Sequence, residues 1–438
     1  MKKTNLLALC DVGTRFAPIE DLVSPKIPLA AILSLFPLVA CMGEGVSRDP
    51  GGGGFVGPLS DDVCDVEWTT GACPERSVSE VESGLIMSEG VVLAASGDGD
   101  VLLAWNDYAF LDEAKLSFVF FGNEAIRQHE VSRPFSVVGK YMAAVADGDG
   151  RFHLVYSETG VRSAIEHVTL FPNSTELPAP NTVPGAPGPI SLGVTRRGSL
   201  ILPAFQPLNL SLGVAEKPQD GDWVLEGDLF SASFDLDTPG VGRSAVAVDS
   251  SGTAHVGYLR AVDIARGQPH YSQRVGSEWT APRTIVDPTA DNLSGYGLDL
   301  VVLRDGSTAM AFYVVRQDNT ASLHLASWRG NDAPKVELLV DNIPLSPSAP
   351  TAGLSLALAA DSADKLHLVA TVPTAETNTV AYWRRGSESP VWIREHVATE
   401  PTPGEVVVDL AVDRENRPHM GIYLSSLQTI LYATREAR

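Results

Sequence analysis

Short apolar runs alternate with clusters of Gly, Asp, Asn and Ser over residues 90–438. One such unit reads SAVAVDSSGTAHVGYL, with an apolar run on each side of the polar cluster. Runs of five or six residues that are rich in Ala, Val and aromatic residues and are bounded by turn formers favour β-strands. The pattern therefore predicts a β-hairpin of Ser244–Val248 and Ala254–Leu259.

This hairpin pattern recurs about every 50 residues. Aligning the copies on the turn gives one residue in each copy, which we call the turn position: Gly99, Gly150, Gly198, Gly252, Gly306, Asp364 and Asn416. Gly, Asp and Asn are the residues that best tolerate the left-handed backbone of a tight turn. The chain is therefore expected to consist of seven structural repeats.

Two further strands follow the hairpin in most copies. After Ala254–Leu259 come His270–Val275, a turn with Trp279, and Thr280–Val286. A four-stranded unit with tryptophan at its last turn is typical of a β-propeller blade. The first strands are rich in small residues, as strands that converge on a narrow axis must be. We predict an all-β, seven-bladed propeller; six or eight blades remain open if the first or third repeat is misaligned.

The two ends of the chain are expected to close the ring. The last repeat supplies three strands, the third being Thr429–Thr434, and the chain then ends. Near the other terminus, Trp68-Thr69-Thr70 resembles Trp279-Thr280-Ala281, and Pro74–Val81 follows as a candidate strand. Pairing Pro74–Val81 with the last blade as its fourth strand would remove an exposed sheet edge.

Four histidines stand in one frame, six residues after an aspartate: His153, His255, His367 and His419. The hairpin turn places His255 opposite Ala247, with its imidazole near the blade surface. Each histidine belongs to a separate sheet, too far from the others to converge on one ion, so we interpret them as packing residues. The Asp-Gly pairs at 97–100 and 147–150 lack the complete calcium-loop pattern and fit tight turns. No metal and no cofactor is expected.

The Asp-Ser-Ser-Gly turn at 249–252 resembles the Asp-box turns of sialidases and related propellers, although its residue order is shifted. The resemblance implies a propeller architecture over residues 62–438. Sialidases also carry an Arg-Ile-Pro element, which this chain lacks. No catalytic residue is therefore transferred from that family.

In a propeller, a ligand site is expected over the axis, where the loops between the second and third strands meet the loops that lead from one blade into the first strand of the next. The longest loops between the second and third strands are predicted at Asn106–Lys115, Arg260–Pro269 and Thr371–Thr379. Arginine, carboxylates and an aromatic ring would suit a carbohydrate or an acidic peptide. The candidate ligand-binding residues are Asp107, Arg243, Arg260, Tyr296, Arg316 and Asp318. The alternative for each of them is an ordinary solvated loop position.

The amino-terminal region predicts where in the cell the protein is located. The apolar run at 27–40 has the length of a signal peptide and ends in Leu38-Val39-Ala40-Cys41. This ending resembles the bacterial lipobox, which implies a lipid-bearing Cys41 and a protein held at a membrane by acyl chains. Met42, rather than aspartate, follows, and the resemblance then implies the outer membrane. We predict a leader at 1–40, a Gly-rich tether at 41–61 and a propeller at 62–438.

Two cysteines remain beyond the lipid-bearing one. Cys64 and Cys73 are expected to form a disulfide in the oxidising envelope. A short loop closed in this way would gain about 2–3 kcal/mol on the chain-entropy model. A zinc site is the alternative, but two cysteines nine residues apart match no zinc spacing.

The balance of charge excludes one class of partner. The 438 residues carry a formal net charge of −22 and show no Lys/Arg cluster, so nucleic acid is not expected to bind. We expect a monomeric envelope lipoprotein whose propeller is a non-catalytic binding or scaffolding module for a glycan or an envelope protein. The alternative is a polysaccharide hydrolase or lyase that uses carboxylates in the central funnel; a purely structural envelope role is a third possibility.

Overall fold

The computed structural model describes most of the chain from residue 76 onward. The described residues are 76–83, 90–110, 113–122, 127–131, 136–160, 163–174, 177–188, 190–206, 211–231, 244–263, 266–286, 292–345, 353–386, 391–401 and 404–435. All of them belong to one compact unit, Asp49–Arg438. Within these ranges every regular element is a strand, and no helix is long and apolar enough to cross a membrane.

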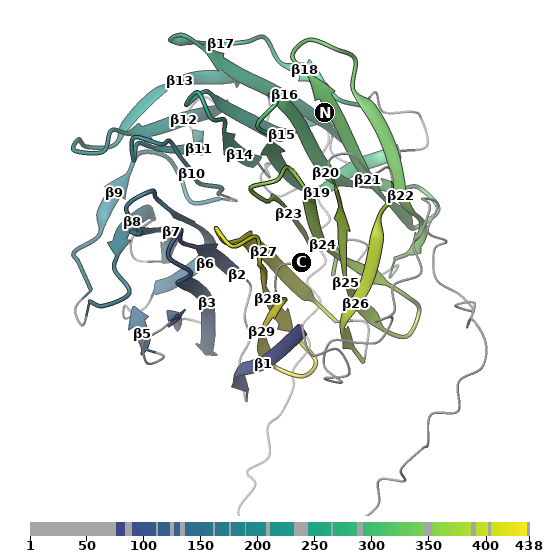
Figure 1. Ribbon diagram of the computed structural model, residues 1–438, viewed down its shortest axis with the longest axis horizontal. Helices are drawn as coiled ribbons and strands as arrows, with labels where there is room; N and C mark the ends of the chain where they lie inside the picture. Colours follow the sequence, from purple (N-terminus) through teal and green to yellow (C-terminus); the bar gives the residue numbers. More distant parts are fainter. Residues whose placement is uncertain are drawn as a thin grey trace, which may run out of the picture. The chain divides into compact units, whose positions relative to one another are not determined.

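The strands form seven antiparallel blades, as the repeats predict (Figure 1). Blades 1 to 3 are β2 (Val91–Ala95), β3 (Val101–Phe110), β4 (Glu113–Phe121) and β5 (Arg127–Val131); β6 (Ser136–Ala146), β7 (Phe152–Gly160), β8 (Ala164–Leu170) and β9 (Asn181–Val183); and β10 (Gly193–Val194), β11 (Leu200–Gln206), β12 (Ser211–Lys217) and β13 (Val224–Ser231). A single parallel bridge, Ala114 to Val137, joins the sheets of blades 1 and 2.

The remaining blades follow the same order. Blades 4 to 7 are β14 (Ser244–Val248), β15 (Ala254–Asp263), β16 (Arg266–Val275), β17 (Glu278–Trp279) and β18 (Arg283–Thr284); β19 (Asn292–Val302), β20 (Ser307–Arg316), β21 (Thr320–Arg329) and β22 (Lys335–Pro344); β23 (Leu356–Ala360), β24 (Leu366–Pro373), β25 (Asn378–Arg385) and β26 (Ile393–Glu400); and β27 (Val406–Val412), β28 (Pro418–Leu424), β29 (Thr429–Arg435) and β1 (Arg76–Ser83).

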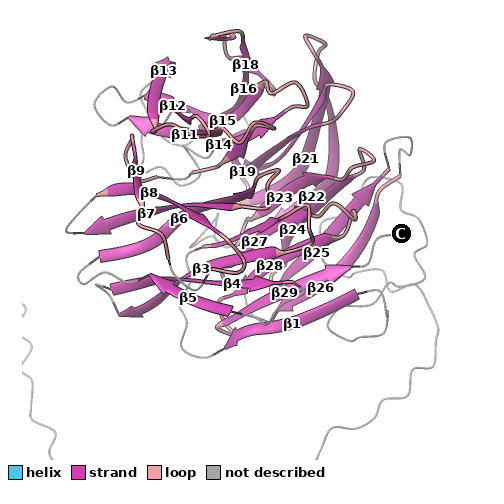
Figure 2. Ribbon diagram, turned by 60° about the vertical axis from the view of Figure 1, so that its left-hand side comes forward, coloured by secondary structure: helices cyan, strands magenta, loops and turns pink. Residues whose placement is uncertain are grey.

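The ring closes as the sequence predicts. β1 pairs antiparallel with β29, from Arg76 opposite Arg435 to Ser83 opposite Thr429 (Figure 2). The amino-terminal strand thus supplies the fourth strand of blade 7, shifted by two residues from the predicted Pro74–Val81. The first strands of neighbouring blades contact one another around the whole ring, and β2 of blade 1 contacts β27 of blade 7.

The seven hairpin turns have the predicted backbone. All seven turn positions have positive φ, from 59° at Asp364 to 89° at Gly252. This is the left-handed region, which Gly, Asn and Asp enter at the lowest cost. The repeat alignment that was based on these residues is therefore confirmed residue by residue.

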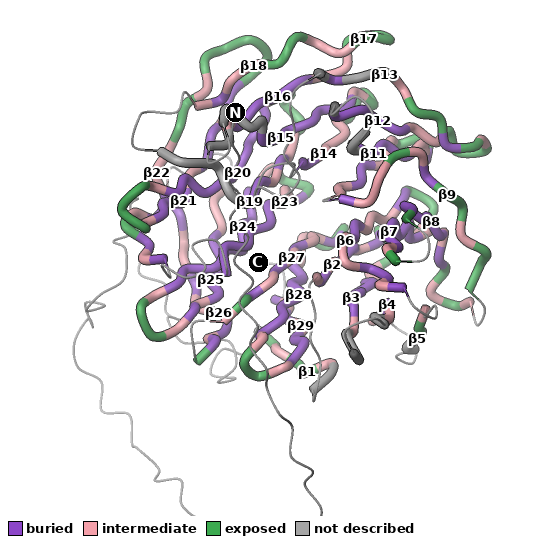
Figure 3. Tube along the Cα trace, turned by 180° about the vertical axis from the view of Figure 1, so that it is seen from behind, coloured by how far each residue is buried: buried purple, intermediate pink, exposed green. Residues whose placement is uncertain are grey.

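Burial is concentrated between the blades (Figure 3). The buried apolar side chains of the described residues form one cluster at each of the seven blade interfaces, including the interface between blades 7 and 1. At this closing interface, Trp105 and Leu103 of blade 1 lie with Tyr423 and Ile430 of blade 7. A repeated blade cannot bury its apolar faces alone, so each blade depends on its two neighbours.

Two local predictions are wrong. Within the predicted fourth strand of blade 4, Thr280–Val286, only β18 (Arg283–Thr284) is a strand, whereas β17 (Glu278–Trp279) lies in the predicted turn. Pro282, directly before β18, cannot donate to a ladder. The long loops expected at Asn106–Lys115 and Arg260–Pro269 are instead extended hairpins, β3–β4 and β15–β16. The hairpin β24–β25 likewise extends from Thr371 to Pro373, so the loop expected at Thr371–Thr379 is shorter.

Candidate functional site

The first strands of the blades enclose a cavity on the propeller axis. Its volume is about 670 Å³, within the range of ligand sites. Its wall comes from β2, β6, β14, β19, β23 and β27 and from the segment that precedes β10. Most lining residues are small or aliphatic, as the composition of the predicted first strands implies.

One position of the repeat forms a ring around this cavity. It lies seven residues before each turn position, and we call it the ring position: Val92, Ala143, Ser191, Ala245, Asp299, Ala357 and Asp409. All seven residues line the cavity. Three are alanine, and two, in blades 5 and 7, are aspartate. The two aspartates therefore differ from the other five residues at the ring position, which have small or uncharged side chains.

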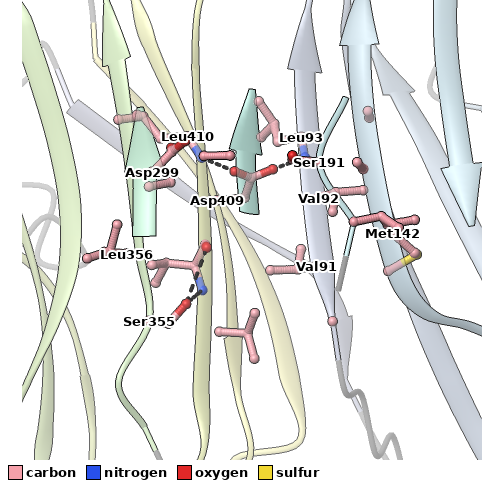
Figure 4. Close-up of a pocket in the computed structure, with 18 of the residues that line it drawn as sticks. Val91, Val92, Leu93, Met142, Ser191, Asp299, Ser355, Leu356, Asp409 and Leu410 are labelled. Atoms are coloured by element: carbon pink, nitrogen blue, oxygen red, sulfur yellow. Dashed lines mark hydrogen bonds between the residues drawn. The ribbon is translucent and has the colours of Figure 1, made fainter. Parts of the chain in front are cut away.

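Each of these two aspartates joins two neighbouring blades (Figure 4). Asp409 accepts a hydrogen bond from the Leu410 N–H at 2.9 Å and another from the Leu93 N–H of blade 1 at 2.6 Å. Asp299 accepts from the Leu300 N–H at 2.8 Å and from the Leu358 N–H of blade 6 at 2.7 Å. Both carboxylates are thus fixed in position by backbone donors.

Both carboxyl groups hold their protons to unusually high pH. Burial raises the pKa of Asp299 to about 6 and that of Asp409 to about 7. The backbone hydrogen bonds act in the opposite direction, and the negative charge of Asp299 further raises the pKa of Asp409. The two groups therefore interact electrostatically across the cavity.

The rest of the lining is polar at a few points. Lys140, Tyr141 and Glu405 lie near the starts of the first strands, further from the hairpin turns than the ring position. The hydroxyls of Ser191 and Ser244 are buried and have no hydrogen-bond partner among the described residues. No group of three or more His, Cys, Asp or Glu side chains is arranged as metal ligands in the part of the chain that the structure describes.

The four framed histidines lie at the other end of the blades and build a repeated relay. The Nε2 atoms of His153 and His419 lie 3.2 and 3.1 Å from Asp147 and Asp413 of the same blade. In blade 7 the other ring nitrogen meets the Tyr432 hydroxyl at 2.7 Å. Equivalent tyrosines bind His255 and His367, both at 2.6 Å.

These relays lie within single blades, and all four histidines are buried, which agrees with the predicted packing role. The pairing of His255 with Ala247 is also as predicted, but its imidazole is buried and not near the blade surface. Burial lowers the pKa of His255 against the attraction of Asp249. Burial raises the pKa of Asp413, but its bonds with His419 and Arg417 outweigh this and bring it to about 2.

Three of the sequence-predicted binding residues have described side chains, Asp107, Arg316 and Asp318, and none of these three lines the axial cavity. Arg316, at the end of β20, donates to Asp341 of β22 at 2.5 Å and thus points toward the outer strand. Asp318 is exposed in the next turn and accepts from the Thr320 hydroxyl at 2.6 Å. Asp107 lies opposite Lys115 in the β3–β4 hairpin, where burial raises its pKa.

The other candidates are only partly described. Arg260 lies opposite Gln268 in β15–β16, and Tyr296 lies opposite Tyr313 in β19–β20; their side chains are not described. Arg243, Cys41, Cys64 and Cys73 lie outside the described residues, as do the predicted leader and tether. A role for these residues stays a prediction.

Sequence reasoning missed Asp299 and Asp409. The signal was present, because both stand at the ring position, where the other repeats carry Ala, Val or Ser. The prediction considered the loops, whereas strands make most of the wall of the axial cavity. Scanning each repeat position for its exceptions would have found the pair.

The fold and the axial cavity define a seven-bladed β-propeller. No family model and no curated protein matches the chain. Among solved structures it is similar to an ulvan lyase from a polysaccharide lyase family, with a TM-score of 0.52 and 10% identity over 88% of this chain and 95% of that one. It is also similar to a Hadza microbial sialidase (TM-score 0.41, 11% identity, 79% and 65% covered) and to an α-L-arabinofuranosidase from Fusarium graminearum (0.47, 10%, 68% and 92%). At 10% identity the likeness to the ulvan lyase shows the fold alone.

Proposed function

We propose that this protein is a non-catalytic glycan-binding propeller of the bacterial cell envelope, and that the glycan enters the axial cavity. The observation that carries the proposal is the pair Asp299 and Asp409 in the wall of that cavity. A carboxylate offers about four acceptor sites. Backbone N–H groups occupy about two on each aspartate, so the remaining sites are available to sugar hydroxyls.

The charge of the cavity favours a neutral sugar. Among its lining residues, Asp299, Glu405 and, above its pKa of about 7, Asp409 carry negative charge, against one cation, Lys140. Like charges brought together at a binding site cost several kcal/mol, about enough to exclude a polyanion. The similar ulvan lyase has been solved with -[GlcA(1-4)Rha3S]-, a repeat that carries carboxylate and sulfate groups. Because the cavity of this chain is acidic, its ligand is expected to lack carboxylate and sulfate groups.

The same carboxyl pair supports the second candidate, a polysaccharide hydrolase or lyase. Paired carboxyl groups that interact across a cavity are the machinery of glycosidases. In such pairs, however, one carboxyl group is the acid and the other stays ionised, because their environments push their pKa values apart. Here burial raises both pKa values, and both groups are held by backbone donors, which favours binding over catalysis.

Anchoring of the protein through Cys41 belongs to the same proposal. Lipid on this cysteine would hold the propeller at the membrane surface. Labelling of cells with an alkyne analogue of palmitate tests whether Cys41 carries lipid. Label on the protein that disappears in the Cys41→Ser variant is expected. Equal labelling of both proteins would overturn the anchor without affecting the glycan site.

The glycan proposal is tested with the full chain that carries Cys41→Ser, presented to an array of neutral and acidic glycans. We expect retention of a neutral class and its loss in the double variant Asp299→Asn/Asp409→Asn. Retention that persists in the double variant, or no retention of any sugar, contradicts the proposal. Release of shortened oligosaccharides from a retained polysaccharide would establish the enzyme instead.

A further inference from the structure

The four Asp–His relays differ in what binds the second carboxylate oxygen. In blades 2 and 7 an arginine directly after the turn position caps it. The Nε atom of Arg151 lies 2.7 Å from Asp147, and that of Arg417 lies 2.6 Å from Asp413. Both capped aspartates are almost inaccessible, with side chains 1% and 0% exposed.

Blade 4 has the relay without the cap. Its residue after the turn position is Thr253, and Ser251 replaces the acidic residue that helps to hold each arginine in blades 2 and 7. Ser251 and Thr253 both donate to Oδ1 of Asp249. Within the described part of the chain, its Oδ2 has one partner, His255 at 3.5 Å, and the Asp249 side chain is 20% exposed.

A pocket of about 320 Å³ opens beside this uncapped carboxylate, at the lower end of the range for ligand sites. Blade 4 contributes Asp249, His255 and Gln273 to it, and blade 5 contributes Thr308 and the glycine turns Gly306 and Gly330. It lies at the hairpin-turn ends of the strands, whereas the axial cavity is lined by residues nearer the starts of the first strands. The two sites are therefore separate.

Blade 6 shows that loss of the arginine alone does not open a site. There Lys365 follows the turn position, and Asp361 lies 3.5 Å from His367, as in blade 4. The Asp361 side chain is nevertheless only 1% exposed. Among the four relays, the one in blade 4 combines an uncapped carboxylate with a pocket beside it.

The charges near the pocket suit a cation. Arg274 is in its lining, but its guanidinium is bound to Glu216 at 2.5 Å and to Glu226 at 3.1 Å. These three residues together carry an excess of one negative charge, and Asp249 adds another. Arg283, which donates to the carbonyl of the lining residue Gly330, offsets one of the two, so an excess of one negative charge remains. The whole chain has a net charge of −22, which attracts cations from a distance.

We propose that this pocket, here called the blade 4 pocket, binds a guanidinium group on an aliphatic stem, placed against Oδ2 of Asp249 where Arg151 and Arg417 act in the sister blades. Planar N–H donors match a carboxylate better than a point charge does. The ligand is then a small guanidinium compound or an arginine side chain of a partner protein. The proposal does not depend on glycan binding.

The test measures binding of agmatine and of the tripeptide Gly-Arg-Gly to the full chain by titration calorimetry, without glycan. Thr253→Arg supplies the missing cap from within, so we expect binding weakened by about tenfold or more. Ser199→Arg is the matched control, because it adds arginine at the same repeat position in blade 3, which has no relay. It should bind as the unaltered protein does.

Asp249→Asn is a second variant, in which the amide oxygen can still accept the turn hydrogen bonds but the charge is lost. It should also weaken binding. Saturable binding of agmatine alone supports the pocket with a small-molecule source, and binding of the tripeptide as well supports an arginine of a partner. No saturable binding of either probe, or equal binding by the unaltered protein and both pocket variants, overturns the proposal.

Discussion

The polar residues at the two ends of the blades behave differently. Near the hairpin turns, the Asp–His relay recurs in four blades, with a tyrosine hydroxyl on the histidine in three of them. Around the axial cavity, aspartate stands at the ring position in only two of seven blades. The relays are internal to a blade, whereas each ring aspartate reaches across to its neighbour and borders an open volume.

This difference separates residues of the fold from residues of a site. A group that recurs at equivalent positions has a structural role that every blade requires, namely to pack the turn and to pair its buried polar groups in hydrogen bonds. A group that breaks the repeat cannot be explained by that shared need. The ring aspartates and the uncapped relay of blade 4 are both exceptions of this kind, and both border a pocket.

The largest effect should follow from breaking the repeat itself. Deleting Arg76–Ser83 removes the fourth strand of blade 7 and a ladder of backbone hydrogen bonds to β29. With each bond worth about 0.5–1.5 kcal/mol, stability should fall by roughly 5 kcal/mol. Thermal unfolding followed by circular dichroism measures the loss. A deletion of eight residues within the predicted tether is the control, and equal melting of both proteins contradicts the closed ring.

A smaller loss is expected from breaking one relay. His419→Ala removes the histidine partner of the Tyr432 hydroxyl and one partner of the buried Asp413 carboxylate, which keeps its bonds to Arg417. At about 0.5–1.5 kcal/mol for each lost hydrogen bond, stability should fall by about 1–3 kcal/mol. Glycan retention by the folded variant should be unchanged. Loss of retention with an unchanged melting temperature would assign the relay to a site.

The ring aspartates should show the reverse pattern. Asp409→Asn keeps one side-chain oxygen that can accept a backbone hydrogen bond but loses the negative charge. The glycan affinity should therefore fall about tenfold, which corresponds to a loss of about 1.4 kcal/mol of binding free energy. The control is Asp318→Asn, which removes an exposed acid from the site predicted in the loops. Titration calorimetry compares the two, and a larger loss in the Asp318 variant would return the site to the loops.

The same two aspartates should also make stability depend on pH. In the folded protein Asp299 and Asp409 keep their protons up to about pH 6 and 7, against an ordinary pKa of 3.8. The folded state therefore binds more protons than the unfolded state between about pH 4 and 7, and this stabilising contribution is lost as the pH rises through that range. The double variant Asp299→Asn/Asp409→Asn should lack this slope in denaturant titrations. An identical slope in both proteins contradicts the raised pKa values.

The turn residues made most of the fold predictable from the sequence. Gly99, Asp364 and their equivalents fix the repeat because few residues tolerate positive φ, and the blade count follows from them. The short fourth strand of blade 4, which begins directly after Pro282, could have been foreseen. The axial site could not be found by a loop rule, because Asp409 lies within a strand and acquires its role only when blade 1 closes beside blade 7.

The most direct test of the account is a crystal structure of the protein with the neutral oligosaccharide that it retains. We predict sugar in the axial cavity, with hydroxyl oxygens within hydrogen-bond distance of the Asp299 and Asp409 carboxylates. Sugar bound at the loop residues Arg316 and Asp318, with no sugar in the axial cavity, would contradict the account.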